Sequence, residues 1–241
     1  MSAAAPKEGR LAGRIALVTG ASRGIGAAVA KRFAAEGAQL ILLARTVGGL
    51  EETDDAVRAA GAPKALLVPL DLRQHDAIDQ LGASLYERYG KLDVLVGNAG
   101  MLGGLSPLGH IQPKRWAEVM DVNLTANWRL IRSLDPLLRR SEAGRAIFVT
   151  SGAARGAHAY WGPYAVSKAA LEALVRTYAA ETRKTEVRAN MVDPGIARTA
   201  MRREAFPGED PDSLPAPDDI TDVFVDLAEA ACAKTGEVVP V

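Results

Sequence analysis

The chain has 241 residues, of which 48% are hydrophobic and 24% are charged, values that fit one globular domain with a sizeable core. Its 29 basic residues balance its 29 acidic residues, which argues against nucleic acid or an anionic membrane as a partner. The single cysteine excludes a disulfide framework, and no segment has the apolar length of a signal peptide or a membrane span. A cytoplasmic protein without nucleic-acid or membrane partners is therefore expected.

Short apolar runs alternate with amphipathic segments along the chain, which predicts alternating strands and helices. The predicted strands are Ile15–Thr19, Gln39–Leu43, Ala65–Leu70, Leu92–Gly97, Ala146–Ser151, Glu186–Val192 and Glu237–Pro240. The predicted helices include Ile25–Ala35, Gln74–Tyr89, Pro113–Arg139 and Tyr164–Arg183. Strands that are apolar throughout are typical of a parallel sheet covered on both faces. The pattern therefore predicts an α/β fold with a doubly wound, seven-stranded parallel sheet.

The domain organisation is expected to be simple. Residues 1–12 are predicted to be a flexible segment, and residues 13–241 a single catalytic domain. Between Phe206 and Asp219 the chain has four prolines and five acidic residues, which cannot continue a helix. We expect a loop at about residues 196–219 that covers the substrate, with a solvated connection as the alternative.

A glycine-rich segment follows the first predicted strand directly. It reads Gly-Ala-Ser-Arg-Gly-Ile-Gly from Gly20 to Gly26 and leads into a predicted helix. Glycines at a strand–turn–helix junction allow the backbone to approach a pyrophosphate at the N-terminus of the helix. The position of the segment predicts a dinucleotide-binding loop.

A second motif places a phenol and an ammonium four residues apart. Tyr164 and Lys168 fall in a predicted helix, where residues i and i+4 share one face. An ammonium near a phenol favours the phenolate, so this pair is suited to general acid/base chemistry. The pair alone is a weak signal, because any amphipathic helix can contain it by chance.

Together with Ser151, thirteen residues before Tyr164, these motifs resemble the short-chain dehydrogenase/reductase family, whose members have a Rossmann fold. The resemblance extends from Gly13 to Val239. It implies that Ser151 binds the substrate oxygen and that Tyr164 passes the proton. It also implies that Lys168 lowers the pKa of Tyr164 and holds the nicotinamide ribose. Asn123 would hold the water of a proton relay.

The resemblance also assigns residues to the dinucleotide. Asp71 would meet the adenine amino group, Asn98-Ala99-Gly100 would lie beside the adenosine ribose, and Pro194-Gly195 with Thr199 would clamp the nicotinamide side. The full set expected to bind cofactor is Gly20, Ser22, Arg23, Gly24, Ile25, Gly26, Arg45, Asp71, Leu72, Asn98, Ala99, Gly100, Tyr164, Lys168, Pro194, Gly195, Ile196 and Thr199. No metal site is expected, because the three histidines have no ligand spacing.

The end of the second predicted strand favours NADP(H) over NAD(H). An NAD-specific site places an acid there to bind the ribose hydroxyls, whereas this chain has Arg45 and no acid before Glu51. A guanidinium can bind the 2′-phosphate of NADP in a bidentate pair, and Arg23 in the glycine loop offers a second one.

The leading hypothesis is an NADP(H)-dependent carbonyl reductase or alcohol dehydrogenase acting on a ketone or secondary alcohol. A catalytically silent NADP-binding sensor or scaffold, or an epimerase or dehydratase on the same fold, are the alternatives. Tyr160 and Trp161 beside Tyr164 suggest an apolar substrate pocket, although they could equally pack an interface or the core. The family implies a homotetramer; a dimer is the alternative, because the chain stops at Val241 without the glycine-rich tail of many relatives.

Overall fold

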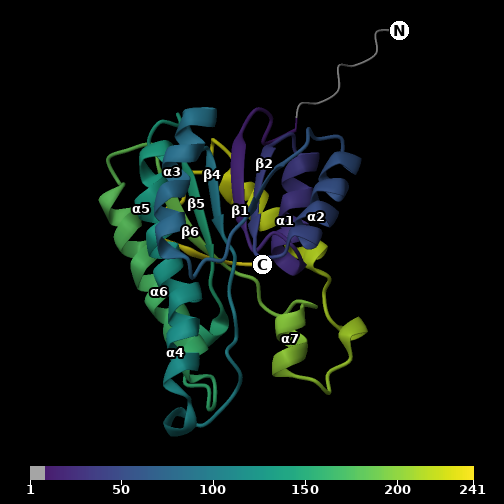
Figure 1. Ribbon diagram of the computed structural model, residues 1–241, viewed down its shortest axis with the longest axis vertical. Coiled ribbons are helices and arrows are strands. Elements are labelled where there is room, and N and C mark those ends of the chain that lie inside the picture. Colours follow the sequence, from purple (N-terminus) through teal and green to yellow (C-terminus); the bar gives the residue numbers. More distant parts are fainter. Residues whose placement is uncertain (1–8) are drawn as a thin grey trace.

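The computed structural model describes residues 9–241, and in this range seven parallel strands form one sheet. Their order is β3-β2-β1-β4-β5-β6-β7, and every neighbouring pair is parallel (Figure 1). The bounds are β1 (Ile15–Thr19), β2 (Gln39–Ala44), β3 (Leu66–Pro69), β4 (Val94–Gly97), β5 (Arg145–Val149), β6 (Arg188–Asp193) and β7 (Val238–Pro240). The doubly wound parallel sheet predicted from the sequence is confirmed.

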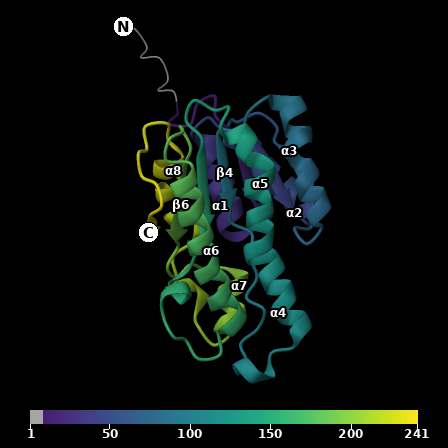
Figure 2. The same ribbon diagram turned by 90° about the vertical axis from the view of Figure 1, so that its left-hand side faces the viewer.

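Helices cover both faces of the sheet (Figure 1, Figure 2). They are α1 (Gly24–Ala35), α2 (Val47–Ala59), α3 (His75–Tyr89), α4 (Pro113–Met120), α5 (Ala126–Leu138), α6 (Gly162–Glu181), α7 (Ala200–Ala205) and α8 (Asp222–Ala228). Neighbouring strand residues point to opposite faces, so Leu17 packs with α3, α5 and α6, whereas Val18 packs with α1, α2 and α8. Because both faces are covered, both side chains are fully buried.

The domain starts earlier than the predicted boundary at residue 13. Leu11 is fully buried in the core with Val29, and its N–H donates to the carbonyl of Glu36 at 2.9 Å. Residues 9–12 therefore belong to the folded domain. The prediction for residues 1–8 lies outside the described residues.

Two segments differ from the predicted elements. The single helix expected over 113–139 consists of α4 and α5 joined by a π-helical segment at Asp121–Thr125. The expected loop at 196–219 contains the short helix α7, capped by the Thr199 hydroxyl, which accepts from the N–H of Arg202 at 3.1 Å. The prolines that follow form two 3-10 turns at Pro211–Ser213 and Pro217–Ile220.

The strand order reverses between β1 and β4, where successive crossovers leave for opposite faces of the sheet. In an open parallel sheet, the carboxyl ends of the strands at this point form a crevice that binds ligands. The helix α7 lies below this edge of the sheet in Figure 1.

Candidate active site

A cleft of about 1420 Å³ opens at the carboxyl ends of the strands. It exceeds the range of roughly 300–1,000 Å³ that suits one drug-sized ligand, so it can take a dinucleotide and a small substrate together. Most of the predicted site residues line it: Gly20, Ser22, Arg23, Gly24, Ile25, Arg45, Asp71, Leu72, Asn98, Ala99, Gly100, Ser151, Tyr164, Lys168, Pro194, Gly195 and Thr199. Gly26, Asn123 and Ile196 are not part of the lining; Gly26 and Asn123 are buried beneath it, and Ile196 is exposed.

The glycine loop is shaped for close approach of a ligand. Gly20 and Gly24 have φ angles of 65° and 57°, in the left-handed region that glycine adopts without strain. A Cβ on Gly26 would lie 2.3 Å from the carbonyl oxygen of Gly20 and 2.5 Å from Nδ2 of Asn98. The loop therefore packs directly on the end of β4, and the first turn of α1 points into the cleft. This geometry fits the pyrophosphate of a dinucleotide.

Gly26→Ala is expected to weaken dinucleotide binding by at least about tenfold, because the clash with backbone outweighs the higher helix propensity of alanine, about 1 kcal/mol. The matched control is Gly48→Ala in α2, where an added Cβ meets nothing within 4 Å. The control is expected to raise the free energy of unfolding by about 0.5–1 kcal/mol and to leave binding unchanged. If the two variants bind the dinucleotide with equal affinity, the tight packing of Gly26 against Gly20 and Asn98 is not needed for binding.

Thr19 and Asn98 tie the glycine loop to the end of β4. The Thr19 hydroxyl donates to the carbonyl of Val96 and accepts from the N–H groups of Asn98 and Ala99 at 3.0 and 3.1 Å. The Asn98 amide donates to the carbonyls of Thr19 and Gly20, at 2.9 and 3.4 Å. The Asn98 side chain is thus engaged with the loop backbone, which fixes the turn beside the cleft.

Two arginines that line the cleft, Arg23 and Arg45, have no carboxylate partner within the described residues. Within residues 9–241, neither Arg23 nor Arg45 forms an ion pair, and both are exposed at the cleft. Asp71, in contrast, is bound by Arg73, with 2.5 Å between Oδ2 and Nη2. Hydrogen bonding from Arg73 holds the pKa of Asp71 below its usual value, so this carboxylate is ionised. Asp71 does not cap α3, whose N-cap residue is Gln74.

Tyr164 and Lys168 lie one turn apart on α6, and both face the cleft. The Lys168 Nζ lies 5.8 Å from the centre of the Tyr164 ring and donates to the carbonyl of Val149 at 2.7 Å. Ser151 follows β5 by two residues, and its hydroxyl accepts from the N–H of Ala153 at 3.2 Å. Of the four residues predicted to act in catalysis, the structure brings Ser151, Tyr164 and Lys168 together in the lining of the cleft.

The direction of the Tyr164 pKa shift differs from the one expected from the sequence. Burial raises the pKa of Tyr164; the Ser151 hydroxyl opposes this and the Asp193 carboxylate adds to it. Burial also lowers the pKa of Lys168 to about 8. The Lys168 ammonium donates to the Val149 carbonyl and is itself desolvated, so burial and not the nearby ammonium sets the direction of the Tyr164 pKa shift. The raised pKa favours the protonated phenol at Tyr164.

Asn123 lies behind the cleft, in the π-helical segment between α4 and α5. Its side-chain oxygen accepts from the N–H of Met101 at 2.9 Å, and its amide donates to the Met101 carbonyl and to Ser167 Oγ, both at 3.0 Å. Its own carbonyl accepts from the Asn127 amide at 2.8 Å. These bonds tie the turn after β4 to α6 and leave the Asn123 side chain fully engaged.

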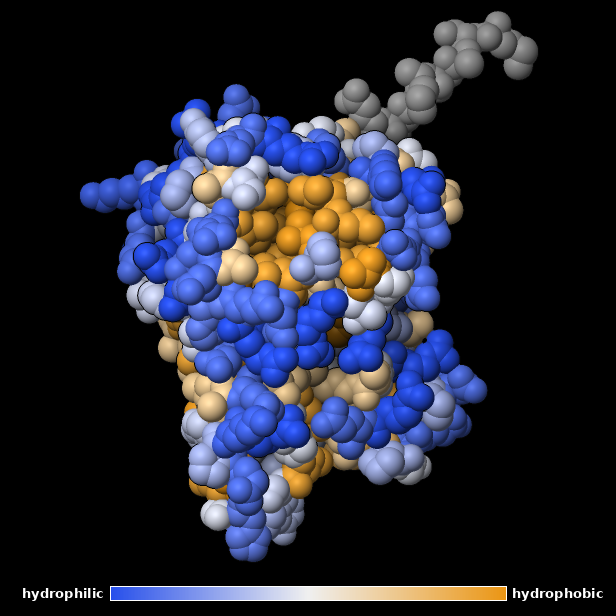
Figure 3. Space-filling view, in the orientation of Figure 1, coloured by the Kyte–Doolittle hydropathy of each residue, from blue (hydrophilic) through white to orange (hydrophobic). Residues whose placement is uncertain are grey.

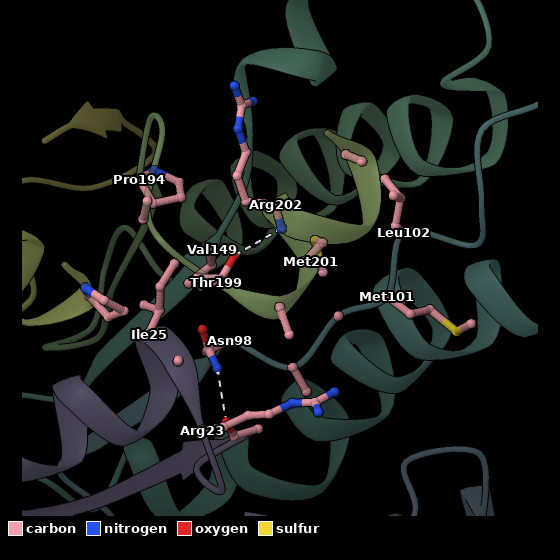
Figure 4. Close-up of a pocket in the computed structure, with 18 of the residues that line it drawn as sticks. Arg23, Ile25, Asn98, Met101, Leu102, Val149, Pro194, Thr199, Met201 and Arg202 are labelled. Atoms are coloured by element: carbon pink, nitrogen blue, oxygen red, sulfur yellow. Dashed lines mark hydrogen bonds between the residues drawn. The ribbon is translucent and has the colours of Figure 1, made fainter. Parts of the chain in front are cut away.

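Apolar side chains form the wall of the cleft next to Tyr164. The Trp161 ring packs against Tyr164 at 5.8 Å and 60°, and against Phe206 beyond α7 at 5.9 Å and 40°. Leu102 and Met201 belong to the same apolar cluster (Figure 4). Of the two residues that the sequence suggested for this wall, Trp161 lines the cleft and Tyr160 does not. Met201 and Phe206 were not predicted; their only signal was their place in the predicted loop.

The arginines on this side of the cleft are mostly neutralised by nearby acids. Arg202 forms a bidentate pair with Glu209, both distances being 2.6 Å, and Arg198 pairs with Asp212 at 2.9 Å. The Arg202 guanidinium also stacks on Phe206, 3.8 Å from the ring centre. Each pair joins α7 or the residues just before it to the proline-rich segment, so the segment at 196–219 is held in place along this side of the cleft.

The sequence matches the profile of the short chain dehydrogenase family over residues 14–210. This chain belongs to that family. An oxidoreductase of Escherichia coli K12, YciK, is 38% identical over 234 residues, which are 96% of this chain and 92% of YciK. The resemblance found from the glycine loop, Ser151, Tyr164 and Lys168 is confirmed, and the protein is an NAD(P)-dependent short-chain dehydrogenase/reductase.

Solved structures of family members show the same fold over nearly the whole chain. A short chain dehydrogenase from Pseudomonas syringae is 40% identical, with a TM-score of 0.94, and the match covers 100% of this chain and 99% of that one. A family member from Escherichia coli CFT073, solved in complex with NADPH, is 38% identical with a TM-score of 0.93 and coverages of 98% and 99%. A Mycobacterium tuberculosis relative at 34% identity, matched over 97% of this chain and 96% of its own length, is named as NAD-dependent.

No helix within residues 9–241 is both long enough and apolar enough to cross a bilayer. No cluster of three or more histidine, cysteine, aspartate or glutamate side chains in the same range is placed to hold a metal ion.

Proposed function

We propose that this short-chain dehydrogenase uses NADP(H) to interconvert a ketone and a secondary alcohol. The observation that supports this most directly is the meeting of Ser151, Tyr164 and Lys168 at the floor of a cleft large enough for a dinucleotide. NADP(H) is favoured because Arg23 and Arg45 line the adenosine end with no carboxylate bound to them within the described residues. The NADPH complex of the Escherichia coli relative supports the same choice.

The bound cofactor would supply the hydride, and the side chains of this chain would supply binding and proton transfer. Ser151 would donate a hydrogen bond to the substrate oxygen and hold it beside Tyr164. The Tyr164 phenol, kept neutral by its raised pKa, would donate its proton to that oxygen during reduction. Lys168 would turn from Val149 toward the cofactor ribose and favour the phenolate that remains. Asn123 would hold the turn after β4 against α6.

The substrate is proposed to be apolar and uncharged near its carbonyl. Trp161, Phe206 and Leu102 surround the space beside Tyr164, and burial of apolar substrate area there contributes about 25 cal/mol per Å². Arg202, which stacks on Phe206, and Arg198 are already paired, so a carboxylate or phosphate on the substrate would find no free partner at either of them. A ketone with a hydrocarbon or aromatic substituent fits this wall best.

The proposal is tested by titrating the protein with NADPH and NADH and then following nicotinamide absorbance with a panel of ketones and aldehydes. Tighter binding of NADPH with turnover of apolar ketones is the expected result. Binding without turnover over a broad panel would favour the sensor or scaffold alternative. Conversion of substrate without net oxidation or reduction of the cofactor would favour an epimerase or dehydratase.

Lys168 gives a pH dependence of stability with a defined sign. Burial lowers its pKa from 10.5 to about 8 in the folded protein, so between these values the unfolded chain binds the proton and the folded chain does not. The free energy of unfolding should therefore rise with pH in this window. Relative to Lys168→Met, the wild type is expected to gain roughly 2 kcal/mol between about pH 7 and about pH 9.5 in urea unfolding. If the free energy of unfolding had the same pH dependence in both proteins, Lys168 would not be desolvated in the folded state.

We also propose that the protein is a homo-oligomer. Trp128 on α5 and Val166 on α6 are 44% and 43% exposed, although both are large and apolar. Figure 3 shows a further apolar area ringed by hydrophilic side chains on one face. Light scattering after size exclusion is expected to give a tetramer or a dimer. Trp128→Glu should lower the measured molar mass toward that of the monomer. An unchanged molar mass would show that α5 is not part of the interface.

A further inference from the structure

Arg155 joins three parts of the active site that carry different functions. It ends the 3-10 turn η3 (Gly152–Arg155), four residues after Ser151. Its Nη1 donates to Oε1 of Glu172 at 2.7 Å, and its Nη2 donates to Oδ2 of Asp193. Both carboxylates are well buried, with side-chain exposures of 4% and 12%, whereas the arginine is 41% exposed. One guanidinium therefore bridges two buried anions from the solvent side.

Glu172 connects this bridge to the helix of the proton-transfer residues. It lies on α6 one turn after Lys168 and accepts from Thr150 Oγ1 at 3.0 Å and from Arg176 Nη2 at 2.8 Å, in addition to Arg155. Thr150 immediately precedes Ser151. A buried carboxylate needs several donors to offset its desolvation, so Glu172 holds the Ser151 segment at a fixed distance from α6.

Asp193 connects the bridge to the turn after β6. It ends that strand just before Pro194, and its Oδ1 accepts from the N–H of Gly195 at 3.2 Å. It also borders the turn after Ser151, because a Cβ on Gly152 would lie 3.8 Å from its Oδ2. Asp193 therefore fixes the backbone expected to clamp the nicotinamide side, and it places a negative charge near Tyr164.

The charge of Asp193 bears on the acid/base residue. The groups that face Tyr164 are the Ser151 hydroxyl, Lys168 on its own helix and Asp193 from β6; of these, Asp193 raises the pKa of Tyr164, as burial does. Arg155 is the guanidinium bound to that carboxylate. Removal of Arg155 would take away the guanidinium that binds the Asp193 carboxylate, so less of the negative charge near Tyr164 would be offset.

We propose that Arg155 is a positioning residue: its bridge from Glu172 to Asp193 sets Ser151 and the Pro194–Gly195 turn relative to Tyr164 and masks the Asp193 charge. The proposal rests on the proposed function for its kinetic consequences, and on the geometry alone for its structural ones. It assigns Arg155 no contact with substrate or cofactor.

The first test compares Arg155→Met with Arg176→Met. Both remove one guanidinium from Glu172, but Arg176 touches neither Asp193 nor the Ser151 segment, and it is 51% exposed. In Arg155→Met, kcat is expected to fall about tenfold or more, with KM changed less than about threefold. Arg176→Met should keep kcat within about twofold, and Arg155→Lys should recover part of the loss. Equal kcat for the two methionine variants would overturn the proposal.

The second test follows the pH profile of alcohol oxidation, which needs the Tyr164 phenolate and so rises with pH through its pKa. In Arg155→Met the midpoint is expected to move to higher pH by at least about half a unit, because the unmasked Asp193 opposes ionisation. Adding Asp193→Asn to Arg155→Met should return the midpoint to the wild-type value or below. A midpoint that stays in place in all of these variants would refute the masking of Asp193.

A third measurement does not depend on turnover and separates this inference from the proposed function. Hydrogen exchange of the ligand-free protein should be at least about tenfold faster in Arg155→Met than in Arg176→Met for amides of residues 150–156 and 193–196. Unchanged exchange in both segments would overturn the positioning role even if no substrate is turned over. A wild type that binds NADPH but reduces nothing, with faster exchange in Arg155→Met, would defeat only the proposed function.

Discussion

Replacement of Tyr164 by phenylalanine is expected to lower kcat by about 100-fold or more, while the Kd for NADPH changes by less than about threefold. Under the proposed function, the phenol is the acid/base group beside Ser151, and a positioned general acid contributes about 10²–10⁴ in rate. The ring itself packs against Trp161, and phenylalanine keeps that contact. The measurement is steady-state reduction of a ketone together with fluorescence titration of NADPH.

The matched control for this prediction is Tyr160→Phe. Tyr160 is another tyrosine only four residues away, but it is 59% exposed and does not line the cleft. Its variant is expected to keep kcat within about twofold. If Tyr164→Phe retains more than about a tenth of the wild-type kcat, equal to a loss of roughly 1.4 kcal/mol or less, the assignment of Tyr164 as the proton donor is wrong.

The second large effect is expected for Arg45→Asp. It replaces a guanidinium that can bind the 2′-phosphate with a carboxylate that repels it, at a position where NAD-specific sites have an acid. A charge-assisted hydrogen bond contributes about 1.5–3 kcal/mol, so the Kd for NADPH should rise by about 100-fold. The Kd for NADH should stay within about threefold. Isothermal titration with each cofactor measures both values.

Arg203→Asp is the control for long-range electrostatics. Arg203 lines the same cleft from α7, on the substrate side, and the substitution makes the same change in charge. It is expected to change the Kd for NADPH by less than about threefold. One contrary result is that Arg45→Asp raises the Kd for NADH as much as that for NADPH; another is that Arg203→Asp raises the Kd for NADPH as much as Arg45→Asp does. Either result would show that the net charge of the cleft sets the affinity, and not a contact with the 2′-phosphate.

The proline-rich segment shows where local patterns lose predictive power. Four prolines correctly excluded a long helix after Phe206, yet the six-residue helix α7 just before them was not predicted. Short helices have little periodicity to detect, and this one depends on a cap from Thr199 and on ion pairs to residues 209 and 212. Such pairs form only when the segment folds back on itself.

For Asn123 and the Tyr164–Lys168 pair, the motifs predicted the residues but not the contacts that they form. Their residue types and spacing placed them in the site, and the structure gathers Tyr164 and Lys168 in one cleft. It also turns Lys168 to Val149 and engages Asn123 with Met101 and Ser167. Orientation and burial set these contacts and the pKa shifts, and neither can be inferred from a motif.

By itself the sequence determined the parallel sheet and the family, and it predicted the dinucleotide loop and the acid/base pair, because hydrophobic periodicity, glycine spacing and helical i to i+4 geometry are local properties. Only the tertiary structure decided which apolar side chains pack beside Tyr164. It placed Arg23 and Arg45 in the lining of the cleft without an ion pair within residues 9–241. It also decided that Arg155 bridges Glu172 and Asp193, residues 17 and 38 positions away. These contacts join segments distant in the chain, and they exist only after the sheet brings its strand ends together.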